Sequence, residues 1–300
     1  MNTYIGETAA LFTAFLWTFT SILFTIAGQH VGSLIVNRTR LLFATSYLII
    51  LHFFLYGALL PVAAEPYRWV WLGLSGIIGL VLGDGLLFQA FILIGARLSM
   101  LIMAIVPIIS TLLAWEFFNE VLSLSEIVAI LLTLGGIVWV ILERNNNTQP
   151  TQSRKYVLGI LCGIGGAVGQ AIALITAKKG LSGDFPALSA NLIRVFTAAS
   201  ILWVAALFKG QISSNFKFMK NPPARSALIA GSVFGPFLGI WLSLIAIKHA
   251  DIGIASTLMA LPPIFLLPLS RWIFKEEISW RAIFGTTLAI VGVAIIFLVP

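Results

Sequence analysis

One carboxylate, Asp84, lies past the midpoint of a long apolar run, within Leu82-Gly83-Asp84-Gly85. A charged side chain in hydrocarbon costs at least about 2.5–3.5 kcal/mol on insertion scales, so we expect Asp84 to face the interior of a helix bundle and to have a task there. A carboxylate in this place can take up and release a proton. The alternative interpretation is a structural carboxylate that pairs with Arg38 or Arg40.

An Asn-x-x-Arg pattern occurs twice, each time at the start of an apolar run. Asn37 and Arg40 form the first copy, and Asn191 and Arg194 form the second. Arginine side chains near the end of a membrane helix can simply reach out to the lipid headgroups. The recurrence of the whole pattern favours something more specific, either anchoring of the helix or contact with an anion.

Further polar and aromatic side chains within the apolar runs are candidates for lining a cavity, namely Trp17, Gln89, Gln170 and Trp241. Gln89 lies about 140° around the helix from Asp84, so these two side chains need not share a face. Together with Asp84 and the two Asn-x-x-Arg pairs, these residues form the predicted pathway for a solute and a proton.

Prolines near the middle of two apolar runs predict breaks in the helices. Pro107 interrupts one run, and Pro262 and Pro263 interrupt another. Proline removes a backbone hydrogen bond and bends a helix. Equivalent breaks in two halves of a chain indicate a transporter binding site, although a fixed structural kink gives the same pattern. After the first break, Ser123 precedes a further run and is expected to cap it.

The composition places all these residues in a membrane. The chain has 300 residues, of which 59% are hydrophobic and 10% are charged, whereas a soluble domain carries about 25% charged residues. The net charge of +7 does not indicate a nucleic-acid partner, because the basic residues lie in short segments between apolar runs, where they set membrane topology. We predict an integral membrane protein whose partners are a small-molecule solute and membrane lipid.

Ten apolar runs are long enough to cross a bilayer, which takes about 20 residues of helix. Each is continuous, which predicts α-helices and excludes the alternating strands of a β-barrel. The runs are 5–27, 34–57, 69–93, 97–118 and 124–142 in the first half, and 156–178, 187–208, 225–247, 252–274 and 280–299 in the second. The polar stretch 143–155 is predicted to link the two halves.

The two halves, 5–142 and 156–299, repeat each other. Gly79 and Gly235 are 156 positions apart, as are Pro107 and Pro263, and the two Asn-x-x-Arg patterns are 154 positions apart. Because each half contains an odd number of spans, like halves must lie in the membrane with opposite orientation. The predicted fold is all-α, with ten transmembrane helices arranged as two inverted five-helix repeats, which is the plan of many secondary transporters.

Signals for catalysis and cofactors are missing from the sequence. There is no GxxxxGK[ST] phosphate loop and no HExxH motif, and the three histidines are scattered. The lone cysteine, Cys162, excludes an intramolecular disulfide. We therefore expect no cofactor, no metal site and no enzymatic activity. An intramembrane enzyme and a passive scaffold are weaker alternatives.

Taken together, these features resemble the drug/metabolite transporter superfamily, in particular proteins with two EamA domains. Besides the repeat, the resemblance is carried by Trp17, the arginine-led second span, Gly83 to Ala90, Met103-Ala104-x-x-Pro107, and a Pro…Glu-x-x-Ser pattern at Pro107, Glu120 and Ser123 and again at Pro263, Glu276 and Ser279. The resemblance implies a central cavity between the halves, alternating access and cytoplasmic termini. The distribution of Lys and Arg favours termini outside, so we predict only that both termini share one side.

We predict a secondary transporter of a small organic solute such as an amino acid, another metabolite or a drug. It is expected to be an exporter of the bacterial inner membrane, to function as a monomer, and to couple transport to protons through Asp84. The alternative is an exchanger or facilitator without a proton step, in which the arginines are fixed counter-charges for an anionic metabolite.

Overall fold

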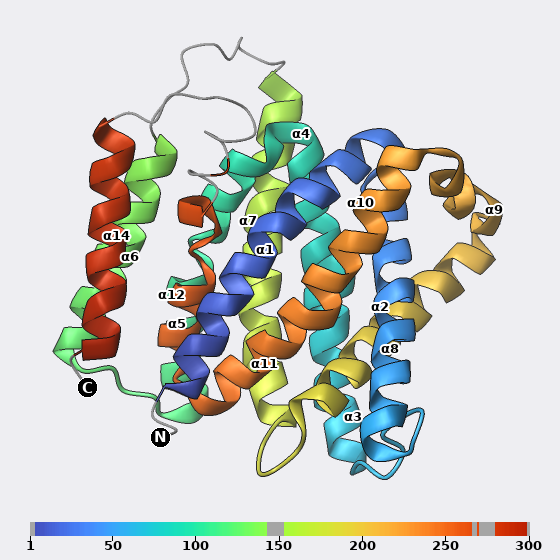
Figure 1. Cartoon of the computed structure of the whole chain (residues 1–300), viewed down its shortest axis with the longest axis horizontal. Helices are drawn as coiled ribbons and strands as arrows, with labels where there is room; N and C mark the ends of the chain where they lie inside the picture. The colour runs from blue at the N-terminus through green and yellow to red at the C-terminus, as the bar shows by residue number, and fades with distance from the viewer. Residues whose placement is uncertain (1–3, 143–152, 266–268, 270–279, 299–300) are drawn as a thin grey trace.

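The computed structural model of the chain describes residues 4–142, 153–265, 269 and 280–298, which form an all-helical bundle (Figure 1). The helices of the first half are α1 (Ile5–Val31), α2 (Ser33–Tyr56), α3 (Pro66–Ser75), η1 (Gly76–Gly83), α4 (Asp84–Met103), α5 (Val106–Phe118) and α6 (Leu124–Leu142). Those of the second half are α7 (Ser153–Gly180), α8 (Ala187–Phe208), α9 (Ile212–Asn215), η2 (Phe216–Lys220), α10 (Pro222–Ser232), η3 (Val233–Gly239), α11 (Ile240–His249), α12 (Ile252–Met259) and α14 (Trp280–Leu298).

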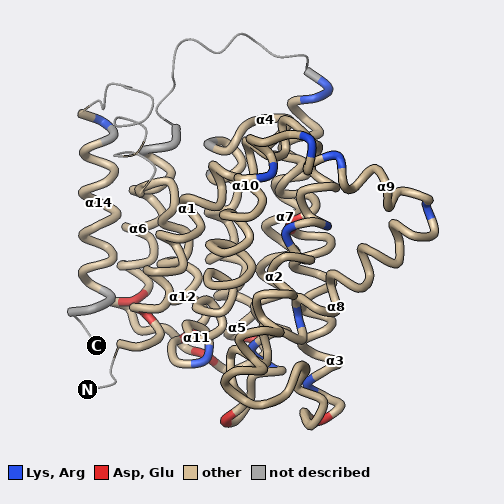
Figure 2. Tube along the Cα trace, turned by 45° about the vertical axis from the view of Figure 1, so that its right-hand side comes forward, with Lys and Arg blue, Asp and Glu red and all other residues tan. Residues whose placement is uncertain are grey.

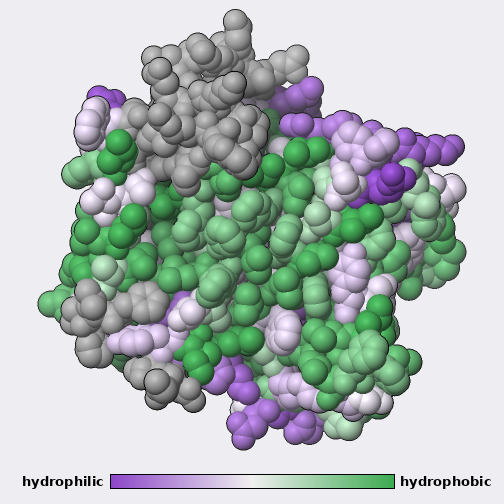
Figure 3. Space-filling view, in the orientation of Figure 1, coloured by the Kyte–Doolittle hydropathy of each residue, from purple (hydrophilic) through white to green (hydrophobic). Residues whose placement is uncertain are grey.

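The surface of the bundle suits a membrane. Figure 3 shows a broad apolar band across the face of the molecule, and in Figure 2 many of the charged residues lie towards the top and bottom of the bundle. Within the described part of the chain, six helical segments are long and apolar enough to cross a membrane, and four shorter apolar helices of 10–17 residues accompany them. The chain is therefore a multi-pass integral membrane protein. The count of ten spans stays a prediction, because the shorter helices fall below the usual span length.

Equivalent helices of the two halves run in opposite directions. In Figure 1, α1 rises from the end where the chain begins, α7 descends towards that end, and α6 and α14 lie side by side as an antiparallel pair. A Cβ atom on Gly136 of α6 would approach Ala289 N to 2.5 Å, and one on Gly292 of α14 would approach Thr133 Oγ1 to 2.4 Å. Glycine at these equivalent positions lets the two helices pack closely.

The helices that contain the central prolines are broken in the structure. The chain leaves the helix after Met103, and Pro107 stands in the first turn of α5. In the second half α12 ends at Met259, and Pro262 and Pro263 follow this break. Proline fits the first turn of a helix, because the N–H groups there have no partner within the helix.

Each half also contains a π-helical turn that the sequence did not predict. The segment η1 lies between α3 and α4, and η3 lies between α10 and α11. Gly83 and Gly239 end these segments; a Cβ atom there would lie 3.2 Å from Ile78 O and 2.6 Å from Phe234 O, the carbonyl oxygens five residues earlier. A π-helix bonds each N–H to the carbonyl five residues back, which brings this oxygen close and favours glycine.

Some predicted features lie outside the described residues. These are residues 143–152 of the linker, residues 266–268 and 270–274 of the ninth predicted span, Glu276 and Ser279. The predicted cap of α6 is confirmed. Ser123 Oγ accepts a hydrogen bond from Glu126 N at 3.3 Å, and Ser123 N donates to Glu126 Oε2 at 2.7 Å. This reciprocal capping box fixes the start of α6.

Candidate solute-binding site

A cavity of about 1020 Å³, counted as space free of atoms and including its open side, lies between the two halves. Its lining comes from α1, α2, η1, α4 and α5 of the first half and from α7, α8, η3, α11 and α12 of the second. Most of the lining side chains are apolar. Among the described lining residues three are charged: Arg40, Asp84 and Arg194.

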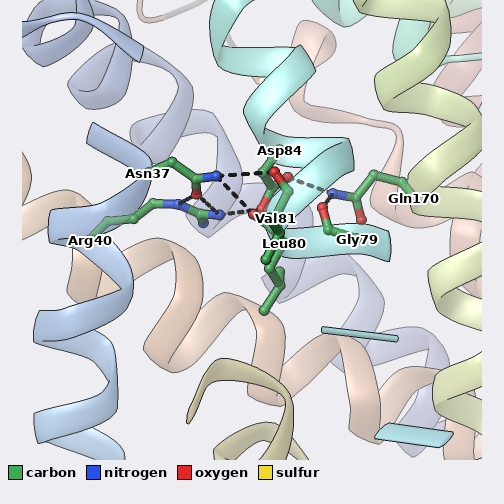
Figure 4. A network of polar contacts seen from close by, with 7 residues as sticks. All are labelled: Asn37, Arg40, Gly79, Leu80, Val81, Asp84 and Gln170. Carbon is green, nitrogen blue, oxygen red and sulfur yellow. Dashed lines mark hydrogen bonds and ion pairs between the residues drawn. The ribbon is translucent and has the colours of Figure 1, made fainter. Parts of the chain in front are cut away.

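Asp84 is held by one donor from each half of the chain (Figure 4). Arg40 Nη2 of α2 donates to Asp84 Oδ2, and Gln170 Nε2 of α7 donates to Asp84 Oδ1, both at 2.5 Å. Arg40 also donates to Asn37 Oδ1, from Nε at 3.0 Å and from Nη2 at 2.9 Å. Both charged residues are buried, with Arg40 3% and Asp84 7% exposed. Hydrogen bonds between ionised groups are stronger than neutral ones, so this network ties α2, α4 and α7 together.

The close approach of α7 to the start of α4 brings Gln170 to Asp84. A Cβ atom on Gly169 would lie 3.0 Å from Gly83 Cα, and one on Gly166 would lie 3.2 Å from Gly83 O. Small residues allow membrane helices to approach at this distance. The glycines around the two polar residues therefore position the contact between them.

Asn37 and Asn191 make the same contact in the two halves. Asn37 Nδ2 donates to the carbonyl oxygens of residues 80 and 81 in η1, at 2.9 and 3.4 Å. Asn191 Nδ2 donates to the carbonyl oxygens of residues 236 and 237 in η3, at 3.0 and 3.2 Å. The two pairs of carbonyls are 156 positions apart. Each asparagine thus satisfies carbonyl groups in a π-helical turn, which explains the anchoring part of the repeated pattern.

The two equivalent arginines differ in their partners. Besides Asp84, the Arg40 guanidinium lies 4.6 Å from the ring centroid of Phe88 and 5.7 Å from that of Phe24. Arg194 is also 3% exposed, yet no described residue accepts a hydrogen bond from it, and its Nε is buried without a partner. Asp84 attracts Arg194 electrostatically, but both Asp84 oxygens already accept hydrogen bonds from other side chains. The cavity therefore holds two guanidinium groups and one carboxylate.

The other predicted pathway residues divide between the cavity and its surroundings. Trp17 lines the cavity, as does Pro262-Pro263. Gln89 accepts a hydrogen bond from Ser33 Oγ at 2.7 Å, and Trp241 packs against the apolar core. Neither Gln89 nor Trp241 belongs to the described lining.

Of the two arginines predicted as possible partners of Asp84, only Arg40 pairs with it in the structure. Arg38 donates instead to Gln211 Oε1 at 3.0 Å and to Asn215 Oδ1 at 3.4 Å, away from the cavity lining. Pro107 is buried beside the cavity but does not line it, whereas its neighbour Val106 does.

Sequence reasoning missed the aromatic part of the site. Phe24 and Phe88 pack edge to face with centroids 5.3 Å apart, and Phe88 stacks on Phe91 at 5.9 Å. All three rings line the cavity. A signal was present, because Asp84, Phe88 and Phe91 have the spacing i, i+4, i+7, which places them on one helix face.

Polar contacts join the halves at the end of the bundle where α1 begins. Lys178 Nζ, at the end of α7, donates to Glu120 Oε1 and, at 3.3 Å, to Ala250 O. Glu120 Oε2 accepts a hydrogen bond from Ile252 N, the first residue of α12, at 2.8 Å. A Cβ atom on Gly6 would lie 2.6 Å from Ala250 Cβ, so α1 packs tightly there too. None of these residues lines the cavity.

The sequence matches the EamA-like transporter family twice, over residues 4–142 and over residues 157–298. The chain belongs to the EamA-like transporter family. Because the two matches fall on the two halves of the bundle, the cavity lies between two EamA repeats. Members of this family are membrane transporters.

The fold of this EamA protein also occurs in a solved structure. The crystal structure of a protein that is 18% identical matches with a TM-score of 0.76, over 98% of this chain and 96% of the other. At this identity the likeness concerns the fold alone. None of the curated proteins matches the chain.

Proposed function

We propose that this EamA protein is a secondary transporter that moves a small organic solute across the membrane by alternating access between two inverted five-helix halves. The observation that carries the proposal is a cavity that both halves line and that contains buried charged side chains. Such charges are costly inside a membrane and mark substrate or ion pathways. In transporters built from inverted repeats, the solute binds at the interface of the repeats, beside interrupted helices. The proposed setting is the bacterial inner membrane, with the protein acting as an exporter and as a monomer.

The contacts at the α1 end of the bundle suit a gate. Glu120 belongs to the first half, whereas Lys178 and Ile252 belong to the second. Opening this end for the solute would separate the halves and break these contacts. Closing it would restore two charge-assisted hydrogen bonds, which stabilises the closed arrangement.

Asp84 is the proposed site of proton coupling. Its two oxygens accept hydrogen bonds from Arg40 and Gln170. A proton on either oxygen would compete with one of these donors, so protonation would loosen a contact that joins α4 to α2 or α7. A proton can drive transport only if the protonated and deprotonated states differ in their affinity for the solute or in their preferred orientation.

Proteoliposomes that contain the purified protein test the proposal. Amino acids, sugars, nucleosides, organic acids and cationic drugs are first screened for thermal stabilisation, since a solute at about 100 times its Kd adds about 2.7 kcal/mol. Uptake of each stabilising solute is then measured with and without an imposed proton gradient. Asp84→Asn is compared with Asp184→Asn, an exposed position that serves as the matched control.

We expect gradient-driven uptake by the wild type and by Asp184→Asn, and no response to the gradient in Asp84→Asn. If no solute class moves under any condition, the chain is not a transporter of small solutes. If Asp84→Asn keeps the wild-type response to pH, Asp84 does not couple protons.

An exchanger without a proton step is the second candidate function. It is favoured by the surplus of guanidinium groups over carboxylates in the cavity, because fixed positive charges suit an anionic metabolite. In the same liposomes, unlabelled solute on the opposite side would then stimulate flux, and the proton gradient would have no effect.

A further inference from the structure

We infer that the solute carries one carboxylate on an apolar body and that Arg194 binds this carboxylate, an inference that rests on the proposed transport function. The observation behind it is a difference between two equivalent sites. Asp84 is the first residue of α4, directly after η1, and its equivalent, 156 positions later, is Ile240, the first residue of α11, directly after η3. The second half therefore keeps the arginine and lacks the carboxylate.

An unpaired charge in a buried place is costly, so its position requires an explanation. Arg194 has 3% of its surface exposed, its Nε has no partner, and it lines the cavity. Its Nη2 lies 3.6 Å from the place of a Cβ atom on Gly79, and Gln170 Oε1 lies 3.7 Å from the same place. A Cβ atom on Gly79 would also lie 2.7 Å from Ala173 Cβ, so glycine allows η1 to pack closely against α7 beside the guanidinium. A partner that arrives with the solute accounts for this buried charge.

The charge balance of the cavity selects a monovalent anion. The described lining contains Arg40, Arg194 and Asp84, which sum to one positive charge. A monocarboxylate neutralises this charge, whereas a zwitterion or a cation leaves it uncompensated and a dianion reverses it. The broken helices do not decide the sign, because each break presents both a carbonyl end and an amide end. A planar guanidinium matches a carboxylate with two parallel hydrogen bonds.

The remaining lining describes the rest of the solute. Phe24, Phe88 and Phe91 form one aromatic wall, and Met103 and Met259, next to the two helix breaks, also line the cavity. Burial of apolar surface against such a wall favours a hydrocarbon or aromatic group. A solute with an apolar body and a single carboxylate fits both parts of the cavity.

A set of matched probes tests the inference on the purified full-length protein. The probes are 3-phenylpropanoate, its neutral amide, 3-phenylpropylamine and phenylalanine, which share a ring and differ in charge, together with butanoate and octanoate, which vary the apolar body. Binding is measured by titration calorimetry for the wild type, Arg194→Gln, Ile240→Asp and Ile240→Asn. Ile240→Asp gives Arg194 the partner that Arg40 already has, and Ile240→Asn is its uncharged control.

We expect the monocarboxylates to bind and the amide, the amine and phenylalanine to bind at least about tenfold more weakly. Loss of a charged hydrogen bond weakens binding by about 10- to 100-fold, so Arg194→Gln and Ile240→Asp should both show this loss and Ile240→Asn should not. Thermal unfolding of the unliganded variants provides the structural control. A merely structural role for Arg194 would lower the unfolding temperature of Arg194→Gln, whereas relief of an unpaired charge would maintain or raise it.

The inference is wrong if no monocarboxylate binds, if the amide binds as well as the acid, or if Ile240→Asp binds the acid like the wild type. Uptake of phenylalanine or the amine into liposomes, unaffected by Arg194→Gln, would overturn the inference and leave the transport proposal intact. Arg194-dependent binding of a carboxylate without any flux would support the inference and contradict transport.

Discussion

Asn37 and Asn191 occupy equivalent positions, and replacing each by alanine should give unequal losses of stability. Both side chains are buried, with Asn37 1% and Asn191 0% exposed, and both donate to two carbonyl oxygens of a π-helical turn. They differ at Oδ1. In Asn37 this oxygen accepts two hydrogen bonds from Arg40, whereas in Asn191 it is buried without a partner among the described residues.

These contacts set the size of the difference. Loss of the amide–carbonyl contact costs about 1 kcal/mol and is common to both variants. Asn37→Ala also loses hydrogen bonds from a charged donor, which contribute about 1.5–3 kcal/mol. Asn191→Ala instead removes an unpaired buried acceptor, whose burial costs about 1–3 kcal/mol. Asn37→Ala should therefore be the less stable variant by at least about 2 kcal/mol, which corresponds to about 4 °C or more in Tm for a chain of this size.

The assay is thermal unfolding of the two purified variants and the wild type in the same detergent at one scan rate, since membrane proteins often unfold irreversibly. Each variant is the other's control, because the residue type, burial and π-helical contact are the same. Equal losses, or a larger loss for Asn191→Ala, would refute the argument that Oδ1 of Asn37 is stabilised by Arg40.

Three other substitutions test the packing, the end contacts and the electrostatics. Gly169→Leu should push α7 away from Gly83 and cost about 1–3 kcal/mol through overpacking, seen as a lower Tm, while Gly169→Ala should be milder. Lys178→Met removes a charged hydrogen bond to Glu120 and should lower stability by about 1.5–3 kcal/mol in detergent, with Lys178→Arg retaining most of it. Burial between α11 and α12 raises the pKa of Asp251, and the nearby Glu120 carboxylate raises it further. The folded protein therefore binds a proton on Asp251 more tightly than the unfolded chain does. The stability that this proton contributes is lost as the pH rises through the raised pKa. Asp251→Asn should therefore be more stable than the wild type at pH 7 and converge with it below about pH 4; a constant gap across pH would contradict this.

The inverted arrangement of the two halves was predictable because it follows from the sequence repeat and from the number of spans in each half. Glycines and prolines recur at a fixed offset, and an odd number of spans per half requires opposite orientations. The π-helical turns were not predictable, because Gly76–Gly83 reads as apolar whether its turn is wide or narrow. The contact that satisfies the wide turn comes from Asn37, more than 35 residues earlier, and local periodicity carries no information about it.

The buried carboxylate could be found from the sequence, but its partner could not. Arg38 and Arg40 are about 200° apart around a helix, so only one can face Asp84. Which one does so depends on how α2 packs against η1 and α4. The same uncertainty affected Gln89, whose face turns to Ser33 and not to the cavity. The residue types in a membrane span indicate that it contains functional side chains. Only the packing of the helices shows which of their faces contact one another.

The unpaired Arg194 has a consequence for how the membrane voltage acts on transport. While Asp84 is deprotonated, an empty cavity has one surplus positive charge and moves it through the electric field whenever the cavity changes the side it faces. A full crossing at 100 mV is worth about 2.3 kcal/mol. In the same protonation state, a cavity loaded with a monocarboxylate is neutral and does not respond. Voltage would thus act on the return of the empty protein and leave the loaded step unaffected. An inside-negative potential would draw the empty site towards the cytoplasm, where an exporter collects its solute.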